Sequence, residues 1–187
     1  MNSVFARMII PAVRPVWGIV LLALLGGSAL ADGGQVNITG KVVANSCEVD
    51  TGGTDKEVYI GQFSTADFPS VGSTTAAKSF TIALKNCTAG IKGTKITFSG
   101  TKAAGNPALL ALSDNGEGTA GVIATGVGVE ILDASMTSIP VNNTDSALYP
   151  LSPDSNQLTF NLRYQSTSAT VTAGDATAVL YFDMQYE

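Results

Sequence analysis

The chain has 187 residues and carries fifteen acidic against ten basic side chains, which gives a formal net charge of −5. An acidic chain without a basic cluster is not expected to bind nucleic acid or an anionic membrane surface. The sequence contains no histidine, which excludes the familiar serine and cysteine triads and a histidine general base. We therefore expect no catalytic residue, no metal site and no cofactor.

The first predicted element, residues 1–31, has the features of a secretory signal peptide. Arg7 and Arg14 precede an apolar run over 16–25, and the small residues that follow end in an Ala-x-Ala site at Ala31. The apolar run is shorter than the ~20 residues that a membrane-spanning helix needs. Cleavage after Ala31 would leave residues 32–187 as one exported domain without a membrane span.

The mature sequence opens with a strand pattern. Residues 36–42 alternate apolar or small side chains with polar ones, which is the period of a half-buried strand. Glycine weakens a strand interior, so Gly40 indicates a place where another backbone or a bulky side chain approaches closely. An ordinary first strand of the domain's own sheet is the alternative interpretation. One face of this strand would carry Val36, Ile38, Gly40, Val42 and Ala44.

The two cysteines, Cys47 and Cys87, both follow the predicted cleavage site. In an exported chain an even number of cysteines is usually paired, so we expect a disulfide between them. The alternative is a metal site, which would require histidines or further cysteines nearby. The sequence has neither, and this favours the disulfide.

Further strand patterns cover most of the remaining chain, with Gly, Pro, Asn and Asp turn signals between them. The apolar run 108–112 is compatible with a strand or with a helical turn. Short strands at these spacings predict an all-β antiparallel sandwich. The predicted strands are 57–63, 78–84, 95–99, 126–132, 157–164 and 176–186. One face of the last strand would carry Ala178, Leu180, Phe182, Met184 and Tyr186.

Two other patterns suggest chemistry that their context does not support. Residues 116–121 match the glycine fingerprint of dinucleotide-binding proteins, but that fingerprint requires a preceding strand and a following helix. A turn precedes these residues and β-prone residues follow them. Glu130 and Asp133 could resemble a catalytic carboxylate pair, yet an odd separation on a strand places them on opposite faces.

Taken in order, several stretches resemble the type 1 family of chaperone–usher fimbrial subunits along nearly all of the mature chain. The similar stretches are 40–47, 80–87, 96–100, 126–133, 158–174 and 182–187. The resemblance implies an incomplete immunoglobulin-like sandwich that lacks its last strand and is completed by a donated strand. It further implies that a periplasmic chaperone lends a strand first, and that the next subunit's amino-terminal segment replaces it at an outer-membrane usher.

The resemblance also assigns roles to particular residues. Residues 32–45 would be the donor strand, and the apolar face of the last strand would line the acceptor groove. Gly174 and Tyr186, together with the terminal carboxylate of Glu187, match positions that the family uses in chaperone recognition. The groove and chaperone residues would thus be Gly174, Leu180, Phe182, Met184, Tyr186 and Glu187.

The implied function is that of a structural subunit, polymerised with itself or with related subunits into a fimbria on the bacterial surface that contributes to adhesion. One alternative is a tip or adaptor subunit that binds a receptor directly. Another is a secreted carbohydrate-binding or enzymatic sandwich, which would have clustered aromatic side chains or catalytic carboxylates.

Overall fold

The structure is a computed structural model that describes residues 44–50, 57–113, 122–144 and 146–187. All of these residues belong to one unit, Val42–Glu187. The predicted donor residues Val36, Ile38, Gly40 and Val42 lie outside the described residues, as does the glycine pattern at 116–121.

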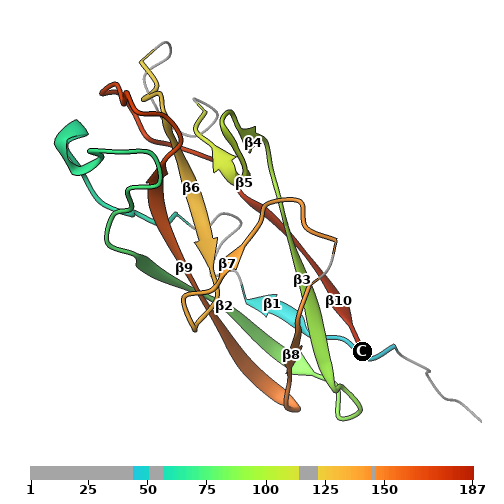
Figure 1. The fold of residues 1–187 in the computed structure, drawn as a ribbon. Helices are drawn as coiled ribbons and strands as arrows, with labels where there is room; N and C mark the ends of the chain where they lie inside the picture. The colour runs from blue at the N-terminus through green and yellow to red at the C-terminus, as the bar shows by residue number, and fades with distance from the viewer. Residues whose placement is uncertain (1–43, 51–56, 114–121, 145) are drawn as a thin grey trace, which may run out of the picture. The chain divides into compact units, whose positions relative to one another are not determined.

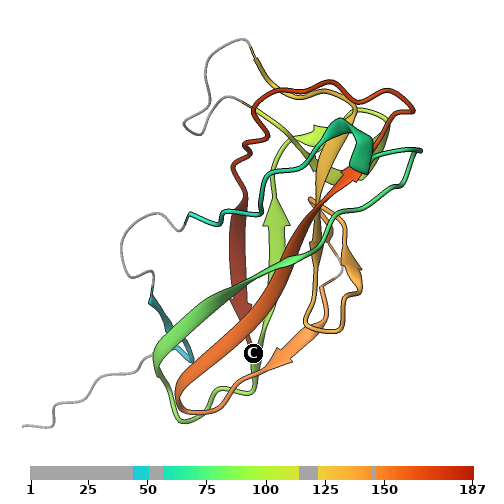
Figure 2. The same cartoon turned by 90° about the vertical axis from the view of Figure 1, so that its left-hand side faces the viewer.

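Two antiparallel sheets form the described part of the chain (Figures 1 and 2). The larger sheet has the strand order β1-β2-β9-β6-β5-β4, with β7 paired to β6, and the smaller sheet has the order β10-β3-β8. The strands are β1 (Glu48–Asp50), β2 (Lys78–Cys87), β3 (Gly93–Ser99), β4 (Lys102–Ala103), β5 (Asn106–Ala111), β6 (Val127–Leu132), β7 (Ser138–Ile139), β8 (Leu148–Pro150), β9 (Asp154–Ser166) and β10 (Tyr181–Tyr186).

Most of the predicted strands are present. The patterns at 78–84, 95–99, 126–132 and 157–164 correspond to β2, β3, β6 and β9. The apolar run 108–112, for which strand and helical turn were both open, lies almost entirely in β5. The fold is the predicted immunoglobulin-like β-sandwich.

Two predicted strands differ from the structure. Residues 57–63 form no strand, and the strand predicted over 176–186 begins only at Tyr181. The alternation is nevertheless present at the start of this segment, because Val58 and Ile60 are half-buried whereas Glu57 and Tyr59 are exposed. A strand also requires a hydrogen-bonded neighbour, and alternation in a sequence does not report whether one exists.

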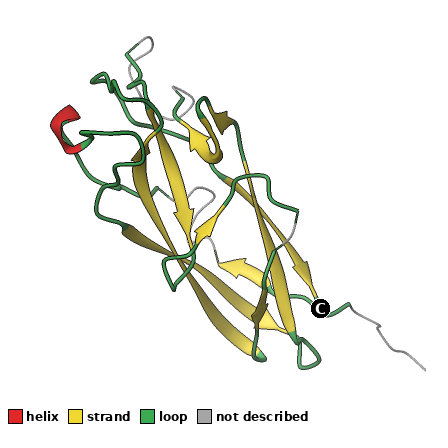
Figure 3. Ribbon diagram, in the orientation of Figure 1, coloured by secondary structure: helices red, strands yellow, loops and turns green. Residues whose placement is uncertain are grey.

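The sequence patterns missed the shortest elements, which are β1, β4, β7, β8 and one helical turn. The described residues contain a single 3-10 turn, Thr65–Asp67, which is drawn in red in Figure 3. It begins with a capping box in which the Ser64 amide donates to the Asp67 carboxylate at 2.7 Å. Elements of two or three residues are too short to show a period.

Aromatic side chains from both sheets meet in the core. The Phe98 ring of β3 and the Phe160 ring of β9 are fully buried, with centroids 5.0 Å apart in an edge-to-face arrangement. The ring centroids of Phe80 and Tyr149 lie 5.7 Å and 5.4 Å, respectively, from the ring centroid of Phe160. This cluster joins the two layers of the sandwich.

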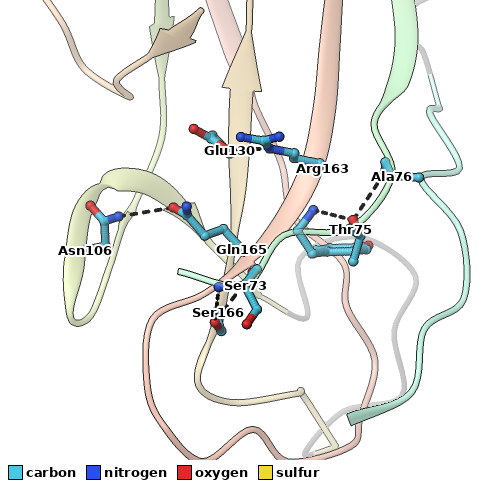
Figure 4. A network of polar contacts seen from close by, with 9 residues as sticks. Ser73, Thr75, Ala76, Asn106, Glu130, Arg163, Gln165 and Ser166 are labelled. Carbon is cyan, nitrogen blue, oxygen red and sulfur yellow. Dashed lines mark hydrogen bonds and ion pairs between the residues drawn. The ribbon is translucent and has the colours of Figure 1, made fainter. Parts of the chain in front are cut away.

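A polar network ties the segment after the 3-10 turn to the end of β9 (Figure 4). The Ser73 amide donates to the Ser166 hydroxyl at 3.0 Å, and the Tyr164 amide donates to the Thr75 hydroxyl at 3.1 Å. These bonds satisfy backbone groups at an edge where regular pairing has ended. The segment is therefore held against β9 although it forms no named strand.

Glu130 and Asp133 have separate structural roles. Glu130 on β6 forms an ion pair with Arg163, its direct cross-strand neighbour on β9, with 2.6 Å between Nε and Oε2. The Asp133 carboxylate instead accepts the amides of Ser135 and Thr137 at 2.8 Å each, which closes a turn. The structure therefore does not bring these carboxylates together as a catalytic pair.

Candidate functional site

The candidate site lies where the edges of the two sheets meet. β1 ends the order of the larger sheet and β10 ends that of the smaller sheet, so each pairs along one side only within the described residues. At one end of this gap the Tyr186 hydroxyl donates to the Cys47 carbonyl oxygen at 3.3 Å. We call the gap the open groove; one wall is formed by residues 47–50 and 57–63, and the other by residues 176–186.

At its other end the open groove widens into a pocket of 440 Å³. The pocket is formed by segments from both walls together with residues of β6 and β9. The Tyr164 hydroxyl donates to the Ala176 carbonyl oxygen at 2.6 Å and fixes one side of it. Its lining includes Tyr59, Gln62, Phe63, Phe68, Val127, Tyr164, Val171, Gly174 and Ala176.

The core face of β10 is incompletely covered. Phe182 lies directly opposite Phe98 of β3, and residues paired in this way share one face of the sheet. Yet the Phe98 side chain is 0% exposed whereas Phe182 is 37% exposed. A large aromatic side chain that points toward the core but reaches solvent indicates that no element among the described residues covers it.

The backbone of β10 also has unused hydrogen-bonding capacity. Glu187 and Gly93 exchange both backbone hydrogen bonds, at 2.9 and 3.4 Å. Hydrogen-bonded and non-hydrogen-bonded pairs alternate along an antiparallel ladder, so the even-numbered residues of β10 are the non-hydrogen-bonded ones. Their N–H and C=O groups therefore point away from β3, into the open groove. These residues are Phe182, Met184 and Tyr186.

The two walls together present half-buried apolar side chains. Four of the predicted acceptor residues, Leu180, Phe182, Met184 and Tyr186, lie on one wall. The opposite wall was not predicted from the sequence as part of the site, although the alternation at 57–63 was visible. The half-buried side chains on that wall are Cys47, Val49, Val58, Ile60 and Phe63.

The narrow end of the open groove is anchored by the predicted disulfide. Cys47 and Cys87 are bonded, and their Cα atoms lie 4.1 Å apart. The Asn156 amide group donates to the Cys87 sulfur at 3.3 Å. Burial raises the pKa of the Tyr186 hydroxyl above its usual value of 10.0, so this hydroxyl is neutral and can donate to Cys47 at neutral pH.

Gly174 lies beside the pocket, where two backbones pass very close to one another. A Cβ atom at Gly174 would lie 2.5 Å from the Ala124 amide nitrogen and 2.7 Å from the Val122 carbonyl oxygen. The Asp175 amide donates to that same Val122 oxygen at 2.6 Å. The glycine is therefore required for this close approach, because any side chain would collide with the neighbouring backbone.

Glu187 lies at the opposite end, beside the start of β3. Its side-chain carboxylate forms an ion pair with the Lys95 ammonium group, with 2.7 Å between Oε1 and Nζ. Its main-chain oxygen accepts a hydrogen bond from the Lys92 amide at 2.8 Å. The hydrogen bond and the charge of Lys95 lower the pKa of the Glu187 carboxyl group. Gly174 thus lies at the start of the segment that leads into β10, and Glu187 lies directly after β10. The apolar acceptor residues lie between these two positions.

Of the predicted donor face, only Ala44 lies within the described residues, where it is exposed. The described part of the chain contains no cluster of His, Cys, Asp and Glu that could hold a metal ion. It also contains no helix that is long and apolar enough to span a membrane.

Comparisons with known proteins agree with this geometry. The family model described as "Fimbrial protein" matches residues 36–187. A type-1 fimbrial protein subunit of Serratia marcescens is 39% identical over 175 residues, covering 90% of this chain and 94% of the relative. A type I fimbria protein of Burkholderia pseudomallei, solved by crystallography, is 38% identical with a TM-score of 0.56, covering 75% of this chain and 88% of that one. The P pilus rod subunit PapA has the same fold, with a TM-score of 0.61 at 23% identity, covering 75% of this chain and 99% of PapA.

Proposed function

This chain belongs to the fimbrial protein family and is a structural subunit of a pilus, and from that premise we propose that its open groove accepts a β-strand donated by a neighbouring subunit. The half-exposed Phe182 on the core face of β10 is the observation that carries the proposal. An open strand edge beside exposed core side chains promotes aggregation unless another strand covers it.

The donor would be the amino-terminal segment of another copy. Its inward positions are every second residue from Val36 to Ala44, which makes five. The β10 wall also has five inward positions, every second residue from Ala178 to Tyr186. Matching the two sets end to end places Gly40 opposite Phe182, whichever direction the donor runs. The one residue without a side chain would therefore meet a bulky aromatic ring of the wall. This accounts for a glycine in the middle of a strand.

An antiparallel donor alongside β10 agrees best with the rest of the fold. Every strand pair among the described residues is antiparallel, and antiparallel pairing is slightly more stable per residue. In this direction Ile38 lies opposite Met184 and Val42 opposite Leu180. Each of these aliphatic side chains would contribute about 1.5–3 kcal/mol through burial.

The same groove would be covered before assembly by a strand of a periplasmic chaperone, with an outer-membrane usher as the place of exchange. Gly174, Tyr186 and Glu187 would contribute to chaperone recognition. In this order of events the signal peptide, residues 1–31, directs export, and the open edge is then covered at every later stage until the subunit is part of the fimbria on the cell surface. No feature of the described residues favours a receptor-binding tip subunit or a carbohydrate-binding module.

The test is strand exchange with synthetic peptides that cover residues 32–46. A chaperone-bound copy of the chain receives each peptide, and the exchange rate is followed by native mass spectrometry. We expect Gly40→Leu to slow exchange far more than Lys41→Ala, since Lys41 points away from the groove. Equal rates for the two peptides would contradict the proposed docking face.

A further inference from the structure

The point where the amino-terminal segment leaves the domain is held by several hydrogen bonds. The Ser46 amide donates to the Thr88 hydroxyl at 3.2 Å, and the Thr88 amide donates to the Ser46 carbonyl oxygen at 3.0 Å. The Asn45 side chain donates to the Gly90 carbonyl oxygen at 3.1 Å and accepts the Thr88 hydroxyl at 3.4 Å. We call Asn45, Ser46, Thr88 and Gly90 the clamp.

The clamp holds the chain directly before the disulfide, so both residues between Ala44 and Cys47 are fixed to the loop after β2. A free linker at this position would let successive subunits swivel about the donated strand. The clamp instead sets the direction in which that strand leaves its own domain.

The same geometry fixes which parts of two subunits meet. In the antiparallel register that places Gly40 opposite Phe182, Ala44 of the donor lies opposite Ala178 of the acceptor. Cys47 of the donor then lies level with Asp175 of the acceptor, roughly 10 Å further along the strand direction. The clamp of the donor must therefore lie close to the pocket end of the acceptor's open groove.

The pocket end of the groove exposes apolar side chains. Tyr59 lines the pocket and is 71% exposed, while Val122, whose carbonyl oxygen accepts the Asp175 amide, is 54% exposed. We call these two residues the rim. Both lie beside segment 172–176, where the register brings the donor's clamp.

We propose that the clamp and the loop it holds, residues 88–90, dock on the rim of the next copy of this chain in a fixed end-to-end contact. This inference rests on the proposed strand donation. It adds a second contact between successive subunits, which sets the angle between them and which an isolated donor peptide cannot form. The partner is a second copy of this chain, because the register joins the donor face of this chain, Val36 to Ala44, to the acceptor face of the same chain, Ala178 to Tyr186.

The experiment compares full fibres with peptide-complemented subunits for three variants of the full chain. Val122→Ser alters the rim and Thr88→Val removes the clamp hydroxyl. Met136→Ser is the matched control, at an exposed apolar residue in the turn between β6 and β7. We expect Val122→Ser fibres to dissociate about tenfold faster in denaturant. Fibres with Thr88→Val should show a persistence length at least twofold shorter by electron microscopy. The control should match the unaltered chain in both measurements.

The peptide arm separates this inference from the proposed function. All three variants should accept the 32–46 peptide at rates within about twofold of the unaltered chain, because the peptide has no clamp loop. Fibres of unchanged persistence length and dissociation rate in both test variants would overturn the end-to-end contact. A peptide that fails to enter the groove of the unaltered chain would instead overturn strand donation itself.

Discussion

Phe98 and Phe182 lie opposite each other on the same face of adjacent strands, yet their surroundings differ completely. Phe98 on β3 has β10 on one side and the Asn142 segment on the other, where the Asn142 amide donates to the Phe98 carbonyl oxygen at 2.7 Å, and its side chain is fully buried. Among the described residues Phe182 on β10 has a strand neighbour, β3, on one side alone, and its side chain is 37% exposed. The two residues have the same chemistry and the same facing direction, so the difference arises from the missing neighbour of β10.

This comparison shows how a sequence can specify a core that its own chain does not complete. The inward residues of β10 are apolar, as those of any core strand would be, and the facing wall at 57–63 has the same alternation. Within the part of the chain that the structure describes, 57–63 pairs with no strand and β10 pairs along one side alone. In the proposed function the occupant is a strand from another copy, and the amino-terminal segment has the matching pattern.

The largest expected effect tests the comparison directly. Phe98→Ala should cost about 3–5 kcal/mol of unfolding free energy in both the free and the peptide-complemented subunit, because the ring is buried in both. Phe182→Ala should cost much less in the free subunit than in the complemented one, where the donor covers the ring. Urea unfolding of the four samples measures this difference. A Phe182→Ala cost that is independent of the peptide would break the comparison.

Removing the disulfide tests what holds the first wall in place. The Cys47–Cys87 bond closes a loop across a sequence separation of 40 residues, and its reduction should cost about 4 kcal/mol. It should also release β1 and thus weaken peptide binding. Unfolding and peptide exchange with and without reductant provide the measurement. Unchanged peptide binding after full reduction would show that the wall formed by β1 is not part of the acceptor.

The glycine of the donor sharpens the comparison by a rescue experiment. A Gly40→Leu peptide should bind the unaltered groove about 1–3 kcal/mol less well, because its side chain overpacks against Phe182. The same peptide should regain most of that loss on a Phe182→Ala acceptor. A Val42→Ala peptide serves as the control, because its loss should not be rescued. Absence of rescue for the leucine peptide would place Gly40 elsewhere in the groove.

The smallest effect concerns the hydrogen bond that joins the walls. Tyr186→Phe should cost about 0.5–1.5 kcal/mol, because it removes the donor to the Cys47 carbonyl oxygen. Burial raises the pKa of the Tyr186 hydroxyl, so its contribution is complete below pH 10.0 and is lost as the pH rises through the elevated pKa. The variant should therefore lose less stability between neutral and strongly alkaline pH. An identical alkaline profile for variant and unaltered chain would contradict this role.

Periodicity and cysteine chemistry were sufficient to predict the sandwich, the long strands and the disulfide. Alternation marks any strand with a buried face, which is why β2, β3, β6 and β9 were visible. The sequence could not show that 57–63 and 176–180 form no strand ladder, because pairing is a property of the whole sheet. The far wall of the groove, with Val49, Val58 and Ile60, was missed for the same reason. The clamp depends on Asn and Thr side chains that meet across 43 residues, and no local pattern reports such a contact.

Amide hydrogen exchange along β10, in monomer and in fibre, tests the central claim most directly. In the freshly refolded monomer at low concentration, the amides of Tyr181, Asp183 and Gln185 should already be protected by β3. Those of Phe182, Met184 and Tyr186 should exchange rapidly and become strongly protected once fibres form. Protection of all these amides in the monomer, or no change on assembly, would show that the open groove is not where a donated strand binds.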